Sequence, residues 1–382
     1  MRQDTQVALT EEIFAHLDAN STAMSESVTI NPVASYICPD RLSREQDVIR
    51  RSPVLMGLGC RLSEPRSYLT DDNTGVPILL LRDDAGRARA FLNACKHRGS
   101  RMLEGVGQVR RRLVCPYHAW TYDLDGTLKM VPQPEGFSGL DYAECGLTEL
   151  PILEEDGLIW VRPIGNTPID GLSHLGALRE EIASYGLGNY HHYETRRIDC
   201  AMNWKTIIDT FLEPYHFTPL HIDTVAPLFI PSLCLFDAYG SHLREVLPRR
   251  SIEELRSRTK SEWSLLPHAA IVYVLFPNTV FIMLIDHVEV WRVFPNSERP
   301  DKSHVNLEFY TPEPATSESA RGHWDRSMNL TIRTVLEEDF PTGEGAQISF
   351  ASKRLSSVIY GRNEPALAHF QRSIAAAVGE TI

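Results

Sequence analysis

Hydrophobic residues recur along this chain in two kinds of pattern, and the changes between them predict its division into parts. At the start, Thr10 is a candidate helix cap, and Ile13 and Phe14 fall on one face of the helix that follows. A polar stretch rich in serine and threonine at residues 19–27 predicts a linker. We therefore expect residues 1–35 to form an N-terminal helix and linker that pack on a larger domain.

From residue 36 to residue 165 the pattern is one of short strands separated by turns. Hydrophobic runs at 77–81 and 88–92 flank the sequence Asp-Asp-Ala-Gly at 83–86, which indicates a β-hairpin. Further short strands are expected at 113–114, 120–128 and 158–161. Residues 36–165 are therefore predicted to form one small all-β domain.

Residues 166–382 mix helices with longer strands. Ser173 is a candidate cap for a helix that carries Leu178 and Ile182 at helical spacing. Helical patterns return at 318–339 and after Pro365. Between the helix that follows Ser173 and the one that begins at residue 318, hydrophobic runs separated by turn residues predict a largely antiparallel sheet. Its strands are expected at 193–202, 271–276, 280–285, 288–293 and 305–310. The predicted fold class is α+β, a small all-β domain plus a domain with an antiparallel sheet flanked by helices.

Composition narrows the class of protein. The 382 residues are 43% hydrophobic and 23% charged, which is typical of globular domains. The net charge of −12 argues against nucleic-acid binding, although the basic run at 110–112 is either a solvated loop or a contact for an acidic partner. Seven cysteines are too few and too scattered for a disulfide framework. With no membrane-length apolar run and no hydrophobic signal core at residues 1–4, we expect a cytoplasmic protein.

Two cysteines and two histidines form matched pairs within 24 residues. Cys95 and His97 are followed, seventeen residues later, by Cys115 and His118. A structural zinc ion would take all four ligands. A Rieske [2Fe–2S] cluster would take both thiolates on one iron and both imidazoles on the other. Because each short loop supplies one sulfur and one nitrogen, the spacing favours the cluster, whereas zinc sites more often pair like ligands.

The residues around these ligands resemble the Rieske domain of the Rieske non-haem iron oxygenases. The similar segments are 93–99 and 115–120, with Asp125-Gly126 after them. The resemblance implies a [2Fe–2S] cluster on Cys95, His97, Cys115 and His118. It also implies that the cluster relays electrons to a second iron.

A second metal site is predicted around His216 and His221. On an unbroken helix, five residues would place these side chains about 140° apart. Pro219 would disrupt such a helix, so that both imidazoles can turn toward one point. Two histidines and one carboxylate on one face of an octahedron leave open positions at Fe(II) for O2 and substrate.

The same oxygenase family provides a model for this site. Residues 203–205 and 213–221 resemble its catalytic iron segment, and residues 336–339 resemble the segment that supplies an aspartate. The resemblance implies a mononuclear Fe(II) held by His216, His221 and Asp339. Glu338 and Asp286 remain alternatives for the third ligand.

The resemblance also implies catalytic roles for Glu213 and Asn203. In the family, an acidic residue at the position of Glu213 hydrogen-bonds an iron ligand on one side and a cluster ligand of the neighbouring subunit on the other. Glu213 would thus join His216 to His118 of an adjacent chain, which implies a homotrimer. The longer Glu, where many relatives have Asp, resembles the subgroup that contains carnitine and related amine monooxygenases.

The activity implied is that of a terminal oxygenase. It uses O2 and electrons that a separate ferredoxin or flavin reductase relays from NAD(P)H, and it hydroxylates an aromatic or otherwise hydrophobic small molecule, as in aromatic hydrocarbon catabolism. The chain is shorter than many ring-dihydroxylating α subunits, which favours an oxygenase without a β subunit. Oxidative N- or O-demethylation is the main alternative. An electron carrier without oxygenase activity and a zinc-organised binding protein are more remote.

The substrate pocket is expected to be apolar, with one of three arginines available for a carboxylate. The predicted wall residues are Phe211, Leu220, Val225, Leu228, Phe229, Phe281 and Met283. The candidate arginines are Arg244, Arg249 and Arg250.

Overall fold

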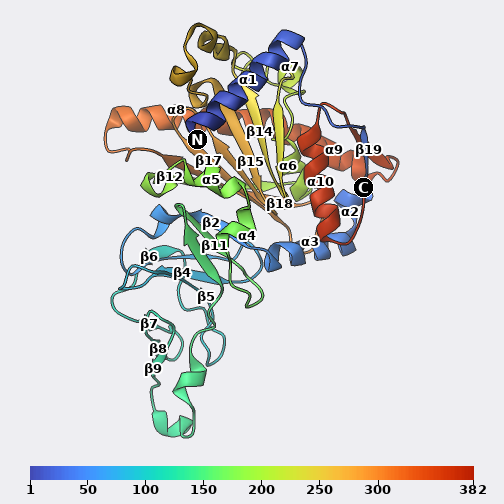
Figure 1. The fold of residues 1–382 in the computed structure, drawn as a ribbon. Coiled ribbons are helices and arrows are strands. Elements are labelled where there is room, and N and C mark those ends of the chain that lie inside the picture. Colours follow the sequence, from blue (N-terminus) through green and yellow to red (C-terminus); the bar gives the residue numbers. More distant parts are fainter. The chain divides into compact units, whose positions relative to one another are not determined.

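The computed structural model describes residues 1–382, which form two compact units. One unit comprises residues 49–174, and the other comprises residues 1–48 together with 175–382 (Figure 1). This division differs from the predicted one, in which the all-β domain covers 36–165. At the N-terminal side the two divisions differ because residues 36–48 are mostly helical and belong to the unit that contains residues 175–382.

The unit formed by residues 49–174 contains three antiparallel sheets. The first has the order β10-β11-β2, with β2 (Val54–Leu58), β10 (Ile152–Glu155) and β11 (Leu158–Val161). The second has the order β5-β4-β3-β6, with β3 (Ser67–Asp71), β4 (Ile78–Arg82), β5 (Ala88–Leu92) and β6 (Val106–Gln108). The third consists of β7 (Leu113–Val114), β8 (Thr121–Tyr122) and β9 (Leu128–Met130).

The predicted hairpin at 77–92 is confirmed. Strands β4 and β5 pair antiparallel from Ile78 with Leu92 to Arg82 with Ala88. In the turn between them, Asp83 Oδ1 accepts hydrogen bonds from two backbone N–H groups, at 2.9 Å each. Gly86 has φ +77°, a conformation that residues with a Cβ rarely adopt. The hairpin leads directly into the loop that carries Cys95.

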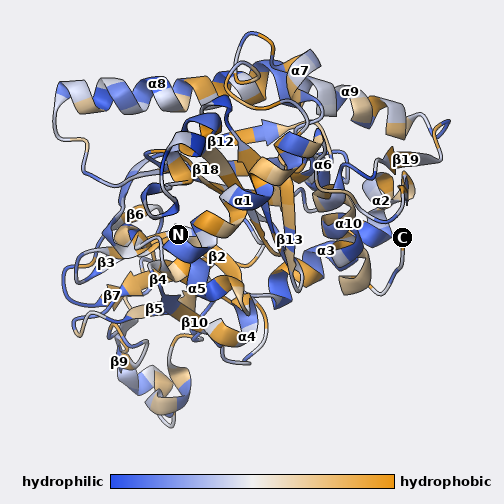
Figure 2. Ribbon diagram, turned by 45° about the horizontal axis from the view of Figure 1, so that its top comes forward, coloured by the Kyte–Doolittle hydropathy of each residue, from blue (hydrophilic) through white to orange (hydrophobic).

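The other unit is built on a seven-stranded antiparallel sheet with the order β12-β18-β17-β16-β15-β14-β13. The strands are β12 (His191–Cys200), β13 (Leu235–Tyr239), β14 (His242–Pro248), β15 (Ala269–Leu275), β16 (Thr279–Met283), β17 (Val288–Pro295) and β18 (Ser303–Thr311). Apart from the outer strands β12 and β13, the sheet is buried on both faces. In Figure 2 its strands are mainly hydrophobic, whereas α1 and α8 alternate hydrophobic and hydrophilic residues. Such alternation is typical of helices that cover a core on one side only.

Helices cover this sheet on its two faces. On one face α10 packs on β13 and β14, and α6 packs on β17. On the other face Glu181 of α5 bonds to Arg244 and Tyr273 of the sheet. The helices of this unit are α1 (Gln3–Ala19), α2 (Ala34–Ile37), α3 (Pro39–Arg51), α5 (Leu178–Ala183), α6 (Trp204–Asp209), α7 (Phe217–Leu220), α8 (Glu318–Thr334), α9 (Phe340–Ala351) and α10 (Pro365–Ala377). The last residues of α3, and most of a further helix, α4 (Gly171–Leu175), belong to the 49–174 unit. A small sheet pairs β1 (Thr29–Pro32) with β19 (Ser357–Tyr360). None of the helices has both the length and the hydrophobicity needed to cross a bilayer.

The prediction of short strands from residue 36 onward is wrong for residues 39–51, which form α3. Pro39 begins this helix, Asp40 lies in its first turn, and Arg50 and Arg51 lie in its last turn. These charges complement the helix dipole, and proline is favoured in the first turn. Only a narrow stripe of the helix is apolar, so its hydrophobic pattern is weak. The terminal charges were the signal that could have revealed it.

Candidate metal centres and substrate pocket

The four residues of the predicted cluster site lie on two loops of the 49–174 unit. Cys95 and His97 follow β5, and Cys115 and His118 lie between β7 and β8. The imidazole rings of His97 and His118 are 4.7 Å apart, centroid to centroid. Both cysteines are buried and neither forms a disulfide. Two buried thiols and two adjacent imidazoles fit the ligand set of a Rieske [2Fe–2S] cluster.

Backbone hydrogen bonds give the two loops their shape. The N–H of Cys95 donates to the carbonyl of Ser100 at 2.7 Å, and that of Cys115 donates to the carbonyl of Trp120 at 2.8 Å. The side chain of Asn93 closes the first loop, since its oxygen accepts from the N–H of Met102 at 3.0 Å. Its amide nitrogen donates to the carbonyl of Leu103. These hydrogen bonds fix the path of the two loops around the four predicted ligands.

Aromatic rings and one hydroxyl surround the cluster ligands. The ring of His97 stacks on Trp120, with centroids 4.9 Å apart and planes 5° from parallel. The hydroxyl of Tyr122 lies 3.3 Å from the sulfur of Cys95 and accepts from the N–H of Lys96. Burial, together with the neighbouring Cys115 thiol, raises the pKa of Cys95. Burial and the charges of His118 and Arg98 lower the pKa of His97, so this imidazole is kept neutral, the form that binds metals.

The predicted iron ligands of the other unit come from two distant segments. His216 and His221 stand at either end of α7, a single helical turn that includes Pro219. His221 leaves the helical conformation, with φ −103° and ψ 30°, so the two side chains do not follow regular helix geometry. Their ring centroids are 4.9 Å apart. The short turn thus brings together two histidines that a continuous helix would separate.

Asp339 reaches the same place from a widened turn between α8 and α9. Residues 335–339 form a π-helical segment, and Pro341 follows in the first turn of α9. Proline has no N–H for the carbonyl four residues earlier and clashes with it, which accounts for the widening of the helix at this point. Hydrogen bonds from the backbone before α6 to Glu344 and Gln347 of α9 also tie the two segments together. The fold thereby fixes Asp339 relative to the histidines.

The three side chains form a compact ligand set. Oδ1 of Asp339 lies 3.5 Å from Nε2 of His216 and 3.2 Å from Nε2 of His221. The candidate ligand atoms of all three residues lie within 4.8 Å of one another. The separations of 3.2 and 3.5 Å are close to those of adjacent ligand atoms on one metal ion, and two imidazoles with one carboxylate fit a facial triad for Fe(II). The residues present therefore fit the predicted mononuclear iron.

Two further acids hold the outer nitrogens of these imidazoles. Glu213 bonds to Nδ1 of His216 and accepts from its backbone N–H at 3.0 Å. Glu338 lies 2.5 Å from Nδ1 of His221 and also accepts from Thr224. Each carboxylate would fix the ring so that Nε2 faces Asp339, as acids do behind many metal-bound histidines. Burial opposes the charged form of His221, but its bonds to Asp339 and Glu338 outweigh burial and raise its pKa.

The geometry separates the alternatives for the third ligand. Glu338 faces the outer nitrogen of His221, and Asp286 bonds to His287 and His323, so only Asp339 lies beside both Nε2 atoms. Asn203 is not brought to the triad. Its side chain caps α6, accepting from the N–H of Lys205 and donating to two backbone carbonyls. These hydrogen bonds fix the start of α6 against Tyr36 and Pro300. The link from Glu213 to His118 of a neighbouring subunit stays a prediction.

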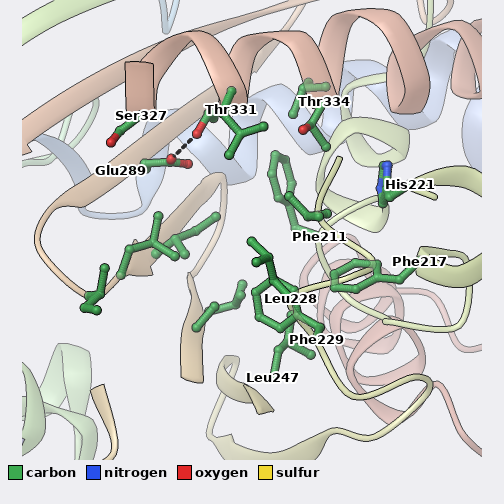
Figure 3. Close-up of a pocket in the computed structure, with 18 of the residues that line it drawn as sticks. Phe211, Phe217, His221, Leu228, Phe229, Leu247, Glu289, Ser327, Thr331 and Thr334 are labelled. Carbon is green, nitrogen blue, oxygen red and sulfur yellow. Dashed lines mark hydrogen bonds between the residues drawn. The ribbon is translucent and has the colours of Figure 1, made fainter. Parts of the chain in front are cut away.

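A cavity of about 350 Å³ opens beside the triad. Most of its wall is apolar, and His216, His221 and Asp339 form part of it. In Figure 3 Phe211 lies between His221 and a polar end that includes Glu289 and Thr331, and Phe217 and Phe229 lie below them. The volume is in the range of pockets for small molecules. A substrate in this cavity would therefore contact the residues predicted to hold the iron.

Predictions about the pocket wall are partly correct. Phe211, Val225, Leu228 and Phe229 line it, whereas Leu220, Phe281 and Met283 do not. On β16 the pocket receives Ile282, because successive strand residues point to opposite faces and the odd-numbered ones face away from it. Phe281 instead contacts Tyr273, on the face toward α5. Of the three candidate arginines, only Arg249 lines the cavity.

Comparison with known proteins places the chain in a family. Residues 187–380 match the family model of the ring hydroxylating alpha subunit (catalytic domain), and residues 59–150 match that of the Rieske [2Fe-2S] domain. The first match covers more than half of the chain, so the chain belongs to this family, whose members are Rieske non-haem iron oxygenases. The predicted α+β fold with a Rieske domain and a second domain is confirmed.

The names of individual relatives describe more specific activities than the family does. The carnitine monooxygenase oxygenase subunit of Escherichia coli (strain K12) is 30% identical over 210 residues, 52% of this chain and 55% of the relative. The glycine betaine monooxygenase oxygenase subunit of Pseudomonas aeruginosa (strain UCBPP-PA14) is 31% identical over 196 residues, 50% of this chain and 45% of the relative. The chain thus spans about half the length of the curated relatives it matches.

Solved structures agree in fold along most of the chain. The quaternary ammonium Rieske monooxygenase CntA in complex with L-carnitine has a TM-score of 0.77 at 19% identity, over 92% of this chain and 95% of that one. Naphthalene 1,2-dioxygenase with indole bound in the active site has a TM-score of 0.72 at 17% identity, over 92% of each chain. At these identities the agreement concerns the fold alone.

Proposed function

We propose that this chain is the terminal oxygenase of a monooxygenase that oxidises a methyl group on the nitrogen of a small amine or quaternary ammonium compound. The observation that carries the oxygenase part is the His216–His221–Asp339 set in the wall of an apolar cavity. Iron bound there would supply O2 binding and activation, as two-histidine, one-carboxylate sites do. Cys95, His97, Cys115 and His118 would hold the [2Fe–2S] cluster that provides the electrons.

The residues of the chain have separate tasks in this function. Glu213 and Glu338 hold the outer nitrogens of the two histidines, which directs both Nε2 atoms toward Asp339. The apolar wall offers water few hydrogen-bond partners beside the triad. Phe211, Phe217 and Phe229 line the cavity, and aromatic rings attract ammonium groups as well as contacting apolar groups. A methylated nitrogen next to the triad would therefore contact aromatic rings.

The reaction balances as follows. One atom of O2 enters a methyl C–H bond, and the other leaves as water, with two electrons and two protons consumed. The resulting hydroxymethyl ammonium loses formaldehyde and a proton, leaving an amine with one methyl group fewer. Electrons would come from NAD(P)H through a separate reductase. A homotrimer, in which Glu213 meets His118 of the next subunit, is part of the same proposal.

Relatives that act on carnitine and glycine betaine favour an amine substrate over a ring. One observation favours a second candidate, hydroxylation of an aromatic or other hydrophobic compound. Nearly the whole wall beside the triad is hydrocarbon, with Val225, Leu228, Leu247 and Ile282 among the lining residues. Such a wall favours apolar ligands in general.

A single-turnover assay separates these candidates without the reductase. The iron-loaded chain is reduced with dithionite, desalted, and exposed to O2 with either a trimethylammonium compound or an aromatic hydrocarbon. The proposal predicts formaldehyde and the demethylated amine, and neither product from the D339A variant. A hydroxylated ring without formaldehyde would favour the second candidate. No oxidised product from any compound would contradict both.

A further inference from the structure

Away from the triad, the substrate cavity is lined by several charged or titratable side chains. They are Arg249, Asp286, His287, Glu289 and His323. Because charged groups in a largely apolar cavity are costly unless paired, each should be matched by a protein partner or by a ligand. Hydrogen bonds and ion pairs within the chain show which of these groups already have a partner.

The two acids are fully engaged by donors of the protein. Asp286 faces Nδ1 of His287 at 2.8 Å with one oxygen and Nε2 of His323 at 2.6 Å with the other. Glu289 accepts from Thr331 at 2.6 Å with one oxygen and from the indole N–H of Trp291 at 2.9 Å with the other. Hydrogen bonding to His287 lowers the pKa of Asp286, so this acid is ionised. Neither carboxylate has an oxygen left without a donor.

Arg249 is the opposite case. Its Nε atom is buried and has no hydrogen-bond partner, and no carboxylate lies within ion-pair distance of its guanidinium. The guanidinium lies over the ring of Phe229, 5.5 Å from the centroid. Asp286 attracts it only from a longer distance. A guanidinium has five N–H donors in a planar fork, and here the protein supplies no acceptor for them.

Arg244, on neighbouring strand β14, shows what a satisfied arginine looks like in this sheet. It faces away from the cavity, donates to Asp237 at 2.7 Å and also pairs with Glu181. The fold can therefore provide acids for a buried guanidinium. At Arg249 it provides an aromatic ring and an open cavity instead.

We infer that Arg249 binds a carboxylate group of the substrate. A carboxylate matches the guanidinium fork with two parallel charge-assisted hydrogen bonds, and it is the partner that this half-buried arginine lacks. The cavity would thus select organic acids with an apolar or methylated ammonium body. This inference deepens the proposed function, because it names the substrate class of the same cavity.

The position of Arg249 also predicts how a substrate is oriented in the cavity. The rings of Phe217 and His221 are 5.5 Å apart, and those of Phe217 and Phe229 are 5.4 Å apart. Since Arg249 lies over Phe229, this row of two phenylalanine rings leads from the triad to the guanidinium. A substrate with its carboxylate at Arg249 would lie along the row and present its far end to the triad.

Binding of two acid–amide pairs tests the inference without turnover. Calorimetry on the purified, metal-loaded chain without O2 compares γ-butyrobetaine with its carboxamide, and phenylpentanoate with phenylpentanamide. We expect at least one acid to bind about 10- to 100-fold more tightly than its amide, the range for a charge-assisted hydrogen bond pair. In Arg249→Met this preference should disappear while the Kd of the amide stays within about threefold, which shows that the variant is folded. Arg249→Lys should keep part of the preference.

The exposed neighbour Arg250 provides the matched control, because Arg250→Met removes an equal charge that does not line the cavity. It should keep the full preference of the wild type. Equal affinity of the wild type for acid and amide in both pairs, or no binding of any probe, overturns the inference. So does a preference that survives in Arg249→Met. If only the phenylpentanoate pair shows the Arg249-dependent preference, the carboxylate site stands and the proposed amine substrate fails.

Discussion

The two histidine pairs of this chain are held in different ways. In the cluster loops, His97 stacks on Trp120 and His118 on Tyr117, and within the chain neither imidazole pairs with a carboxylate. In the other unit, His216 and His221 each have a carboxylate on Nδ1, and Asp339 faces both Nε2 atoms. The difference suggests that the first pair depends on loop shape and aromatic packing, and the second on acids that orient each ring and bring negative charge to the metal.

The largest effect is expected from Cys115→Ser. This change removes a buried cluster ligand and should abolish the visible absorption of the [2Fe–2S] cluster, since the cluster needs all four of its ligands. Because the triad lies in a different unit, Fe(II) should still bind there. Absorption spectra and Fe(II) titration of the same sample check both statements. A variant that keeps its visible spectrum would show that Cys115 is not a ligand.

The acids behind the triad should have a smaller but clear effect. Glu338→Gln keeps the shape of the side chain but removes the charge next to Nδ1 of His221. We expect the affinity for Fe(II) to fall by about 10- to 100-fold, the usual cost of losing such a partner. Glu337→Gln, whose side chain is exposed, is the matched control. Equal Fe(II) affinity of the two variants would mean that Glu338 does not support the ligand.

The sequence predicted the cluster ligands, which are close together in the chain, better than the iron ligands, which are far apart in it. Cys95 to His118 lie within 24 residues, so their spacing alone pointed to a cluster. Asp339 lies more than one hundred residues after His221, and no spacing rule connects them. Its selection over Glu338 relied on family resemblance, and the structure then showed that the π-helical turn directs these adjacent acids to opposite sides of His221.

Two kinds of feature were not accessible from the sequence. The first is which face of a strand points to the pocket, since a shift of one residue exchanges Phe281 for Ile282. The second is the pairing of charged side chains. Arg244 and Arg249 lie close together in the sequence, and only the fold shows that Arg244 has acidic partners and Arg249 has none. The polar helix at 39–51 was missed for another reason, since its apolar stripe is narrow.

A third prediction concerns Glu245, an acid of β14 that is fully buried and whose two oxygens have no hydrogen-bond partner. Burial raises its pKa from 4.5 to about 8. The unfolded chain releases this proton near its ordinary pKa, whereas the folded chain keeps it up to about pH 8, so stability should fall as pH rises through this interval.

Glu245→Gln removes this titration. The difference in free energy of unfolding, variant minus wild type, should increase by about 1–3 kcal/mol from pH 5 to pH 9. Denaturant titration of both proteins at the two pH values measures this difference. Glu344→Gln, which alters a partly buried acid of α9, serves as the comparison and should show no such gain. Parallel pH dependence of wild type and Glu245→Gln would rule out a protonated Glu245.

The smallest expected effect is that of Tyr122→Phe at the cluster. Its hydroxyl lies 3.3 Å from the sulfur of Cys95, and losing a hydrogen bond to a ligand sulfur destabilises the reduced, more negative cluster. One hydrogen bond of about 1 kcal/mol corresponds to a decrease on the order of 50 mV in reduction potential. A redox titration monitored in the visible range checks the value. An unchanged potential would mean that the hydroxyl does not donate to the sulfur.

The central claim is that this chain holds two separate metal centres, and a metal and sulfide count tests it most directly. Wild type should contain about three iron atoms and about two acid-labile sulfides per chain, from one [2Fe–2S] cluster and one mononuclear iron. Asp339→Ala should retain about two of each and keep the visible spectrum of the cluster. Equal iron content in wild type and Asp339→Ala, or wild type without labile sulfide, would contradict the account.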